Sequence, residues 1–269
     1  MAEPAALPTY EVYAIRYATR AGRRADNFIG GDPHDGPMPL DYYVWAIVGA
    51  DRSYVVDTGF TAEVAERRQR EFLRCPAEAL RLVSIEPETV SDVILTHLHY
   101  DHVGNFDRFP NATFHLQETE LHYAVGRYMR YRKLRHSYEV EDVVGIVRAN
   151  YAGRVHFCEG VTELAPGLTL HPAPGHSAGL QFVRVNTARG LVVLASDVTH
   201  FYENMETERP YVTAFHVGCM LEGFDKLRAA APTPDHIIPG HDPLVMQRYP
   251  APRPEVAGIV VRLDVPPTH

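Results

Sequence analysis

Four potential metal ligands lie within six residues of this chain, in the run Thr96–His102, which reads THLHYDH and follows an apolar stretch. Because His97 and His99 are two positions apart, their imidazoles project to one side of an extended segment, whereas helical metal sites place paired histidines four apart. Asp101 and His102 follow where the chain must turn, and adjacent residues of a loop can point to opposite sides. The spacing therefore predicts a strand end and a site for two neighbouring metal ions.

Three further candidate ligands, His176, Asp197 and His241, each lie at or after the end of an apolar, strand-like run. A Pro-Gly pair precedes both histidines and indicates a loop, while Asp197 ends the buried-strand pattern Leu191–Asp197. Imidazole and carboxylate ligands without thiolates suit zinc, iron, manganese or cobalt, and the ligand type does not choose among them. The alternative is a set of histidines satisfied by hydrogen bonds at a protein surface.

Together these motifs resemble those of the metallo-β-lactamase superfamily, whose ligand motifs appear here in order. The run Tyr54–Gly59 also resembles the early strand-and-turn element of that superfamily, in which Asp57 would support the site without binding metal. The resemblance implies an α+β fold, a four-layer αββα sandwich of two mixed β-sheets flanked by helices. The metals would lie between the loop edges of the two sheets.

The resemblance implies seven ligands, three for each of two divalent metal ions and one that bridges the ions: His97, His99 and His176; Asp101, His102 and His241; and Asp197. Zinc is the expected metal, with iron, cobalt and manganese as alternatives. A hydroxide that bridges the two metals would attack an ester carbonyl, and Asp101 would pass a proton to the departing alkoxide.

Within the superfamily, the details are most similar to the N-acyl-homoserine lactonases, which open the lactone ring of quorum-sensing signals. The similarity rests on Asp197 where many β-lactamases use cysteine, on Tyr100, and on the segment 197–204. It implies a metal-dependent ester hydrolase that degrades these signals. Well-known members carry a tyrosine three residues after the bridging aspartate, where this chain has His200. Either His200 or Tyr202 is therefore expected to bind the lactone carbonyl, unless both only pack near the metals.

The sequence leaves other functions as alternatives. Other lactone or carboxylic ester hydrolases and a glyoxalase II-like thioesterase share the ligand set, but too few residues follow His241 for the helical domain with which the thioesterases bind glutathione. A β-lactamase is disfavoured by Asp197 and by the absence of a signal-peptide pattern. A flavodiiron role would need a flavin domain, and a non-enzymatic metal-binding module would not need all seven ligands.

The organisation expected is one hydrolase domain over residues 1–269 with a helical insert at about 118–150, where Val140, Val143, Val144 and Val147 recur at helical spacing. Arginines and tyrosines interleave in the insert and could bind nucleic acid, but a solvated helix face or a contact with a second copy is favoured. The net charge of -8 gives no attraction for nucleic acid or anionic membranes. We expect a cytoplasmic enzyme with a small lactone or ester substrate and a homodimer as its assembly.

Strands are expected over Tyr10–Tyr17 and Tyr42–Ile47, separated by a long loop over Gly22–Pro39. A charged surface helix is expected over Thr61–Leu73. The long loop and the aromatic insert are expected to form an apolar wall for an acyl chain. An apolar wall discriminates only weakly between acyl chains of different length, so we expect the enzyme to accept a broad range of acyl lengths.

Overall fold

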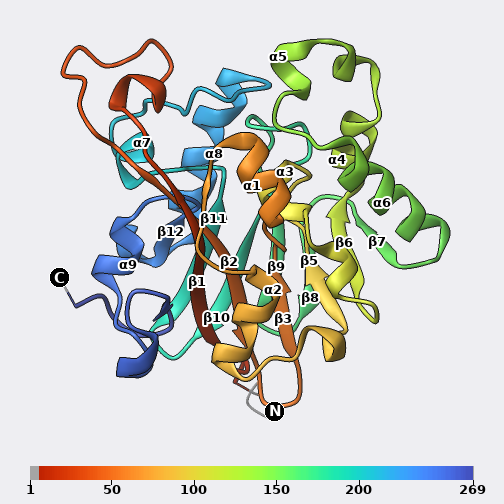
Figure 1. The fold of residues 1–269 in the computed structure, drawn as a ribbon. Helices are drawn as coiled ribbons and strands as arrows, with labels where there is room; N and C mark the ends of the chain where they lie inside the picture. Colours follow the sequence, from red (N-terminus) through yellow and green to blue (C-terminus); the bar gives the residue numbers. More distant parts are fainter. Residues whose placement is uncertain (1–5, 269) are drawn as a thin grey trace.

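The computed structural model describes residues 6–268, which form two β-sheets packed face to face with helices on their outer surfaces (Figure 1). The first sheet has the strand order β13-β1-β2-β3-β5-β6-β7, with β4 paired to β1. The second has the order β12-β11-β10-β9-β8. Both sheets mix parallel and antiparallel pairs, because β3, β5, β6 and β7 run parallel in the first and β11 and β12 run parallel in the second.

The strands of the first sheet are β1 (Glu11–Arg20), β2 (Leu40–Val48), β3 (Ser53–Val56), β4 (Glu71–Phe72), β5 (Asp92–Ile94), β6 (Thr113–Gln117), β7 (Val155–Cys158) and β13 (Val260–Arg262). Those of the second are β8 (Thr162–Ala165), β9 (Leu168–Pro172), β10 (Gln181–Thr187), β11 (Gly190–Ser196) and β12 (Ile237–Pro239). The α-helices are α1 (Ala62–Arg68), α2 (Pro76–Ala79), α3 (Tyr100–Val103), α4 (Glu118–Ala124), α5 (Arg132–Arg135), α6 (Val140–Tyr151), α7 (Tyr202–Glu206), α8 (Val217–Ala230) and α9 (Leu244–Arg248). Short 3₁₀ helices are η1 (Arg24–Asp26), η2 (Leu80–Val83), η3 (Pro87–Thr89), η4 (Phe106–Arg108), η5 (Arg127–Arg130), η6 (Pro234–His236) and η7 (Pro254–Val256).

Strand β2 shows how the layers form, because both of its faces are buried. Tyr43, Trp45 and Ile47 pack between the two sheets, whereas the alternate residues Val44 and Ala46 pack toward the helices of the first sheet. This follows from the two-residue period of a strand. A third core joins the outer face of the second sheet to α8. The expected four-layer αββα sandwich is confirmed.

Helix α1 is shorter than the helix expected over Thr61–Leu73. Gln69 ends it in a left-handed conformation with φ of 56°, and its backbone N–H bonds back to the last turn. Glu71 and Phe72 then pair with β1 as β4. Tertiary pairing therefore overrides the helical pattern of the last residues.

The segment expected as a helical insert contains α4, η5, α5 and α6 and projects beyond the first sheet (Figure 1). Helix α6 covers the predicted valine repeat, but its buried side includes Val143, Ile146 and Ala149, while Val140 is 70% exposed. The apolar face is thus rotated from the one that the repeat suggested. Within the part of the chain that the structure describes, no helix combines the length and the apolarity needed to cross a membrane. The single-domain organisation stays a prediction.

A buried acid on α6 gives a test of stability. Burial, followed by repulsion from Glu139, raises the pKa of Asp142 to about 7, and its Oδ2 has no hydrogen-bond partner among the described residues. Because the folded chain holds this proton more tightly than the unfolded chain, this group lowers stability progressively as the pH rises from about 4 to about 7. Asp142→Asn should therefore stabilise the protein by roughly 2–4 kcal/mol above pH 8 and by less at pH 5.

Denaturant unfolding at pH 5 and pH 8.5 measures this effect. The matched control is Glu141→Gln, which removes the same charge from an exposed position of the same helix. An equal gain from both variants, or a gain from Asp142→Asn that does not grow with pH, would contradict the assigned role of burial.

Candidate metal centre and pocket

The candidate ligands all follow the carboxyl ends of strands, most of them in loops, with Asp101 and His102 in the short helix α3. Strand β5 ends three residues before His97, β11 ends directly before Asp197, and β12 ends two residues before His241. Since β11 and β12 run parallel, Asp197 and His241 lie at the same edge of the second sheet. Gly240 permits the close approach of these loops, because a Cβ there would lie 2.7 Å from the Ser196 carbonyl oxygen.

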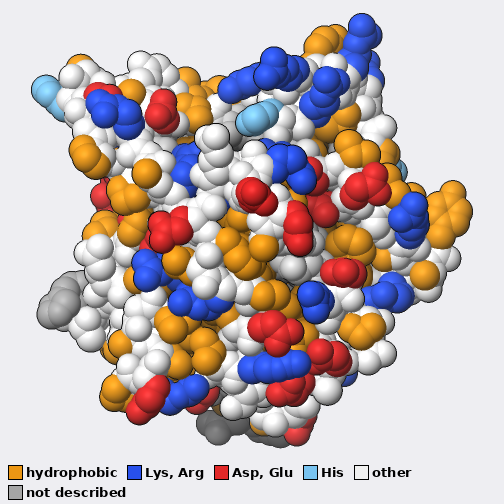
Figure 2. Space-filling view, viewed as in Figure 1, with side chains coloured by type: hydrophobic (Ala, Val, Ile, Leu, Met, Phe, Trp, Pro, Cys, Tyr) orange, Lys and Arg blue, Asp and Glu red, His pale blue; other side chains and the backbone are white. Residues whose placement is uncertain are grey.

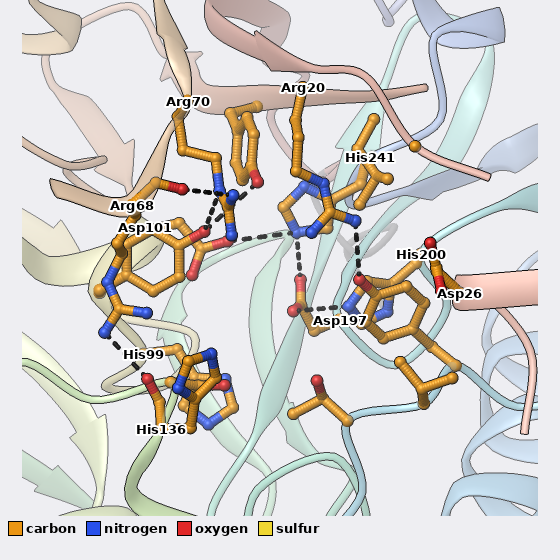
Figure 3. A pocket seen from close by; sticks show the side chains of 18 of the residues that line it. Arg20, Asp26, Arg68, Arg70, His99, Asp101, His136, Asp197, His200 and His241 are labelled. Carbon is orange, nitrogen blue, oxygen red and sulfur yellow. Dashed lines mark hydrogen bonds and ion pairs between the residues drawn. The ribbon is translucent and has the colours of Figure 1, made fainter. Parts of the chain in front are cut away.

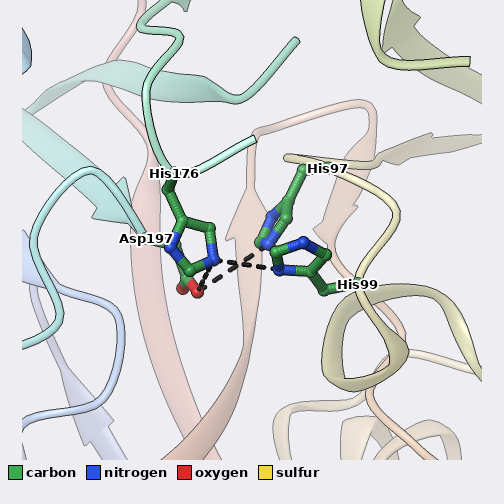
Figure 4. A group of neighbouring side chains, drawn as sticks. All are labelled: His97, His99, His176 and Asp197. Carbon is green, nitrogen blue, oxygen red and sulfur yellow. Dashed lines mark hydrogen bonds and ion pairs between the residues drawn. The ribbon is translucent and has the colours of Figure 1, made fainter. Parts of the chain in front are cut away.

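A first cluster contains His97, His99, His176 and Asp197, all buried (Figure 4). The Asp197 Oδ2 atom lies 3.0 Å from His176 Nε2 and 3.7 Å from His97 Nε2. His176 Nε2 is also 2.9 Å from His99 Nδ1. Three imidazole nitrogens therefore converge on one oxygen of a single carboxylate.

A second cluster contains Asp101, His102 and His241, also buried. His241 Nε2 lies 3.0 Å and His102 Nε2 lies 3.3 Å from the other oxygen of Asp197, Oδ1. Asp101 Oδ2 is 3.7 Å from His241 Nε2. Asp197 thus directs one oxygen toward each cluster, which is the geometry that a bridging carboxylate requires.

The donor atoms fit divalent metal ions. His97 Nε2 and His102 Nε2 are buried and have no hydrogen-bond partner among the described residues, and a buried nitrogen without a partner is costly. Burial and neighbouring histidines lower the pKa of His97 and His99 well below its usual range, which favours the neutral imidazole that metals bind. Ions in the two clusters would satisfy both nitrogens.

Neighbouring groups fix the orientation of several ligand rings. His176 Nδ1 is 2.9 Å from the Thr213 carbonyl oxygen and His241 Nδ1 is 2.9 Å from that of Asp41, so each Nδ1–H donates outward and leaves Nε2 free to face the cluster. Asp57 lies 2.7 Å from His102 Nδ1 and accepts hydrogen bonds from the backbone and the hydroxyl of Thr96. It lies where a supporting, non-ligating residue was expected.

Glu120, at the start of α4, is a supporting residue that the sequence motifs did not indicate. It is fully buried, and its carboxylate accepts hydrogen bonds from the backbone N–H groups of Leu98 and Gly179 and from the hydroxyls of Ser177 and Tyr138. Two of these donors are next to ligand histidines. Glu120 therefore links the loops that carry His97, His99 and His176. It is not part of any sequence motif, so nothing in the sequence indicates this role.

The two candidate carbonyl partners lie in different places. His200 Nε2 is 3.1 Å from Asp197 Oδ2, and its ring stacks on Tyr211 with 3.6 Å between centroids. Burial is the main cause that lowers the pKa of His200 to about 3, so its ring is neutral at pH 7. Tyr202 instead packs in the core between the sheets, with Arg248 over its ring. The structure thus brings His200 to the metal cluster and does not bring Tyr202 there.

A cavity of about 520 Å³ opens over the clusters (Figure 3). Its lining combines candidate ligands, the histidine at 200, three tyrosines and four basic side chains: His99, Asp101, His176, Asp197 and His241; His200; Tyr42, Tyr100 and Tyr211; and Arg20, Arg68, Arg70 and Lys133. The long loop and the insert both reach it, through Ala25 and Ser137 for example. Apolar side chains such as Ala25, Leu40 and Val212 form only part of the described lining, which is largely polar and basic, and the apolar wall for an acyl chain stays a prediction.

The comparisons with known proteins agree with this geometry. The model of the metallo-beta-lactamase superfamily matches residues 38–241, which include all seven expected ligands. The N-acyl homoserine lactonase AttM of Azorhizobium caulinodans is 30% identical over 244 residues, 79% of this chain and 85% of that protein. The N-acyl homoserine lactonase of Bacillus cereus is 34% identical over 133 residues, and the match spans 49% of this chain and about half the length of that relative, 48%.

Solved structures show the same fold. A quorum-quenching N-acyl homoserine lactone lactonase superposes with a TM-score of 0.73 at 23% identity, covering 89% of this chain and 94% of that one. A probable metal-dependent hydrolase from Staphylococcus aureus superposes with a TM-score of 0.74 at 13% identity, covering 98% and 97%. The sandwich, the ligand order and the matched family model agree, and the chain belongs to the metallo-beta-lactamase superfamily.

Proposed function

We propose that this protein is a dinuclear metal-dependent hydrolase that opens the lactone ring of N-acyl-homoserine lactones. The observation that carries the proposal is Asp197, whose two oxygens each face a separate cluster of imidazoles beneath an open cavity. The lactonase names of the relatives support this substrate class. The reaction adds water to the ring ester and gives a carboxylic acid and an alcohol.

The metal ligands in this proposal are the seven residues of the two clusters. His97, His99 and His176 would hold one ion, the set Asp101, His102 and His241 would hold the other, and Asp197 would contact both. Two adjacent divalent ions would polarise the ester carbonyl and lower the pKa of bound water, so that hydroxide is available as the nucleophile near neutral pH. Zinc is the metal that we propose.

The remaining chemistry falls to side chains of the pocket. The Asp101 carboxylate lines the cavity and would carry a proton to the alkoxide oxygen that leaves the carbonyl. His200 lies on the opposite side of Asp197 in Figure 3 and would donate a hydrogen bond to the carbonyl oxygen. Burial lowers the pKa of His97 and His99 and so favours their neutral, metal-binding form.

The decisive experiment is hydrolysis by the metal-loaded protein together with its metal content. We expect about two metal ions per chain and release of one equivalent of acid from N-acyl-homoserine lactones, measured in a pH-stat and by mass spectrometry. Simple lactones, aryl esters and glutathione thioesters serve as comparison substrates. If every homoserine lactone stays intact while another ester or thioester is cleaved, the lactonase proposal falls; full activity with one ion per chain would exclude the dinuclear site.

Three finer points belong to the same proposal. Elemental analysis of protein from native expression tests zinc against iron, cobalt and manganese.

A homodimer is proposed because apolar side chains such as Val125 and Val140 are exposed on the helical segment at 118–151. Light scattering tests this assembly. A cytoplasmic location is tested by cell fractionation.

A further inference from the structure

Two arginines line the cavity without a carboxylate partner. Arg20 ends β1, Arg70 lies between α1 and β4, and across residues 6–268 no carboxylate oxygen is within 4.0 Å of either guanidinium. Arg20 Nη2 donates to the Tyr211 hydroxyl at 3.4 Å. Arg70 Nε donates to the Tyr100 hydroxyl at 3.1 Å, and its Nη1 donates to the carbonyl oxygen of Arg68.

Leaving these charges unpaired is costly, because both side chains are partly buried and a guanidinium stays protonated at all physiological pH values. The Nε atom of Arg20 is buried and has no partner among the described residues. Two other arginines are paired: Arg68, which also lines the cavity, contacts Glu139, and Arg24 contacts Asp32 and Glu203. Unpaired guanidiniums that line a cavity are therefore a feature that an anionic ligand would satisfy.

The nearest acids of the pocket do not fill this role. Asp101 and Asp197 face the metal clusters, where divalent ions would neutralise them. Asp26 lines the cavity from an exposed position. Lys133, on α5, adds a further positive charge to the lining, and Figure 2 shows Lys and Arg side chains gathered over the helical segment around α5. The local charge is thus opposite to the net charge of -8 of the whole chain.

We propose that the substrate of this site carries a compact anionic group, a carboxylate or a phosphate-type group, that binds Arg20 and Arg70 while its ester bond lies at the metal clusters. Figure 3 shows the two guanidiniums directed into the same cavity, above Asp101 and Asp197. The planar N–H donors of arginine match the oxygens of such anions. This inference rests on the proposed hydrolase function and narrows its substrate class.

The test compares homoserine lactones that differ only at the end of the acyl chain. N-glutaryl-homoserine lactone ends in a carboxylate, N-(4-phosphonobutanoyl)-homoserine lactone ends in a phosphonate, and N-pentanoyl-homoserine lactone is neutral. The wild-type enzyme should show kcat/KM at least about tenfold higher for one or both anionic lactones than for the neutral one, as expected for a charge-assisted pair. The favoured anion tells carboxylate from phosphate recognition.

The double variant Arg20→Gln/Arg70→Gln should bring the ratio of anionic to neutral kcat/KM close to one. Arg130→Gln is the matched control, because Arg130 is exposed, lies outside the cavity and carries the same charge. This control should keep the wild-type ratio. No preference in the wild-type enzyme, or an unchanged preference in the double variant, would overturn the inference.

Binding of glutarate and of inorganic phosphate, measured by calorimetry, separates this inference from the proposed function. If none of the lactones is cleaved, the lactonase proposal fails, but anion binding still decides the inference. We expect the double variant to bind at least one of the two anions about tenfold or more weakly than the wild-type protein and Arg130→Gln do. Equal binding by all three proteins would show that the arginines do not hold an anion.

Discussion

Asp101→Asn is expected to lower turnover on lactones by about 10²–10³-fold while most of the metal stays bound. The amide keeps an oxygen that can contact a metal, but it cannot accept and return a proton. Asp101 lines the cavity, and its Oδ2 lies 3.7 Å from His241 Nε2, so the group is placed for both tasks. Steady-state kinetics and elemental analysis of the same preparation separate turnover from coordination.

His97→Ala is the comparison variant. It removes a nitrogen that is buried in the first cluster and has no hydrogen-bond partner within residues 6–268, so metal and activity should be lost together. Wild-type turnover by Asp101→Asn on a substrate with a poor leaving group would disprove its role as proton donor. Loss of metal in Asp101→Asn in proportion to activity would instead make it a ligand only.

The metal centre was predictable because each ligand follows a strand end in a short motif. The motif at 97–102 fixes its own geometry through residue spacing, and His176 and His241 are each preceded by Pro-Gly. The position of Asp57 behind His102 also agrees with the prediction. Ligands that are predicted separately from such short motifs come together in the fold because the ends of neighbouring parallel strands meet at one edge of a sheet.

The pocket was less predictable, because its walls come from residues that no motif connects. Arg20 ends β1, Arg70 follows α1, and Tyr211 lies far along the chain, yet all three line one cavity. Only tertiary packing brings them together. Composition pointed to an apolar wall from the long loop and the insert, but the side chains that face inward are mainly polar and basic.

Local sequence also left the choice between His200 and Tyr202 open. The two positions are separated by one residue, Phe201, whose backbone is extended at the start of α7. His200 therefore stays with the cluster, while Tyr202 begins the helix and packs into the core between the sheets. Two positions so close in the chain therefore lie in different environments, one at the metal cluster and the other in the core between the sheets.

His200→Phe is expected to lower kcat on lactones by about 10²-fold with little change in KM, as for a hydrogen bond made mainly in the transition state. The neutral ring has one N–H, which faces Asp197 Oδ2 at 3.1 Å and would donate to the carbonyl oxygen once metal ions occupy that carboxylate. Phenylalanine keeps a ring that can stack on Tyr211 while removing that donor. Tyr202→Phe is the control and should keep the wild-type rate, since Tyr202 does not line the cavity.

Metal content must be measured in the same His200→Phe preparation, because His200 also forms a third group of candidate ligands with Asp197 and His241. A slower enzyme that retains about two ions assigns His200 to the carbonyl oxygen. A slower enzyme that has lost metal assigns it to coordination. An unchanged rate would leave the carbonyl to the metals alone and would remove His200 from the reaction.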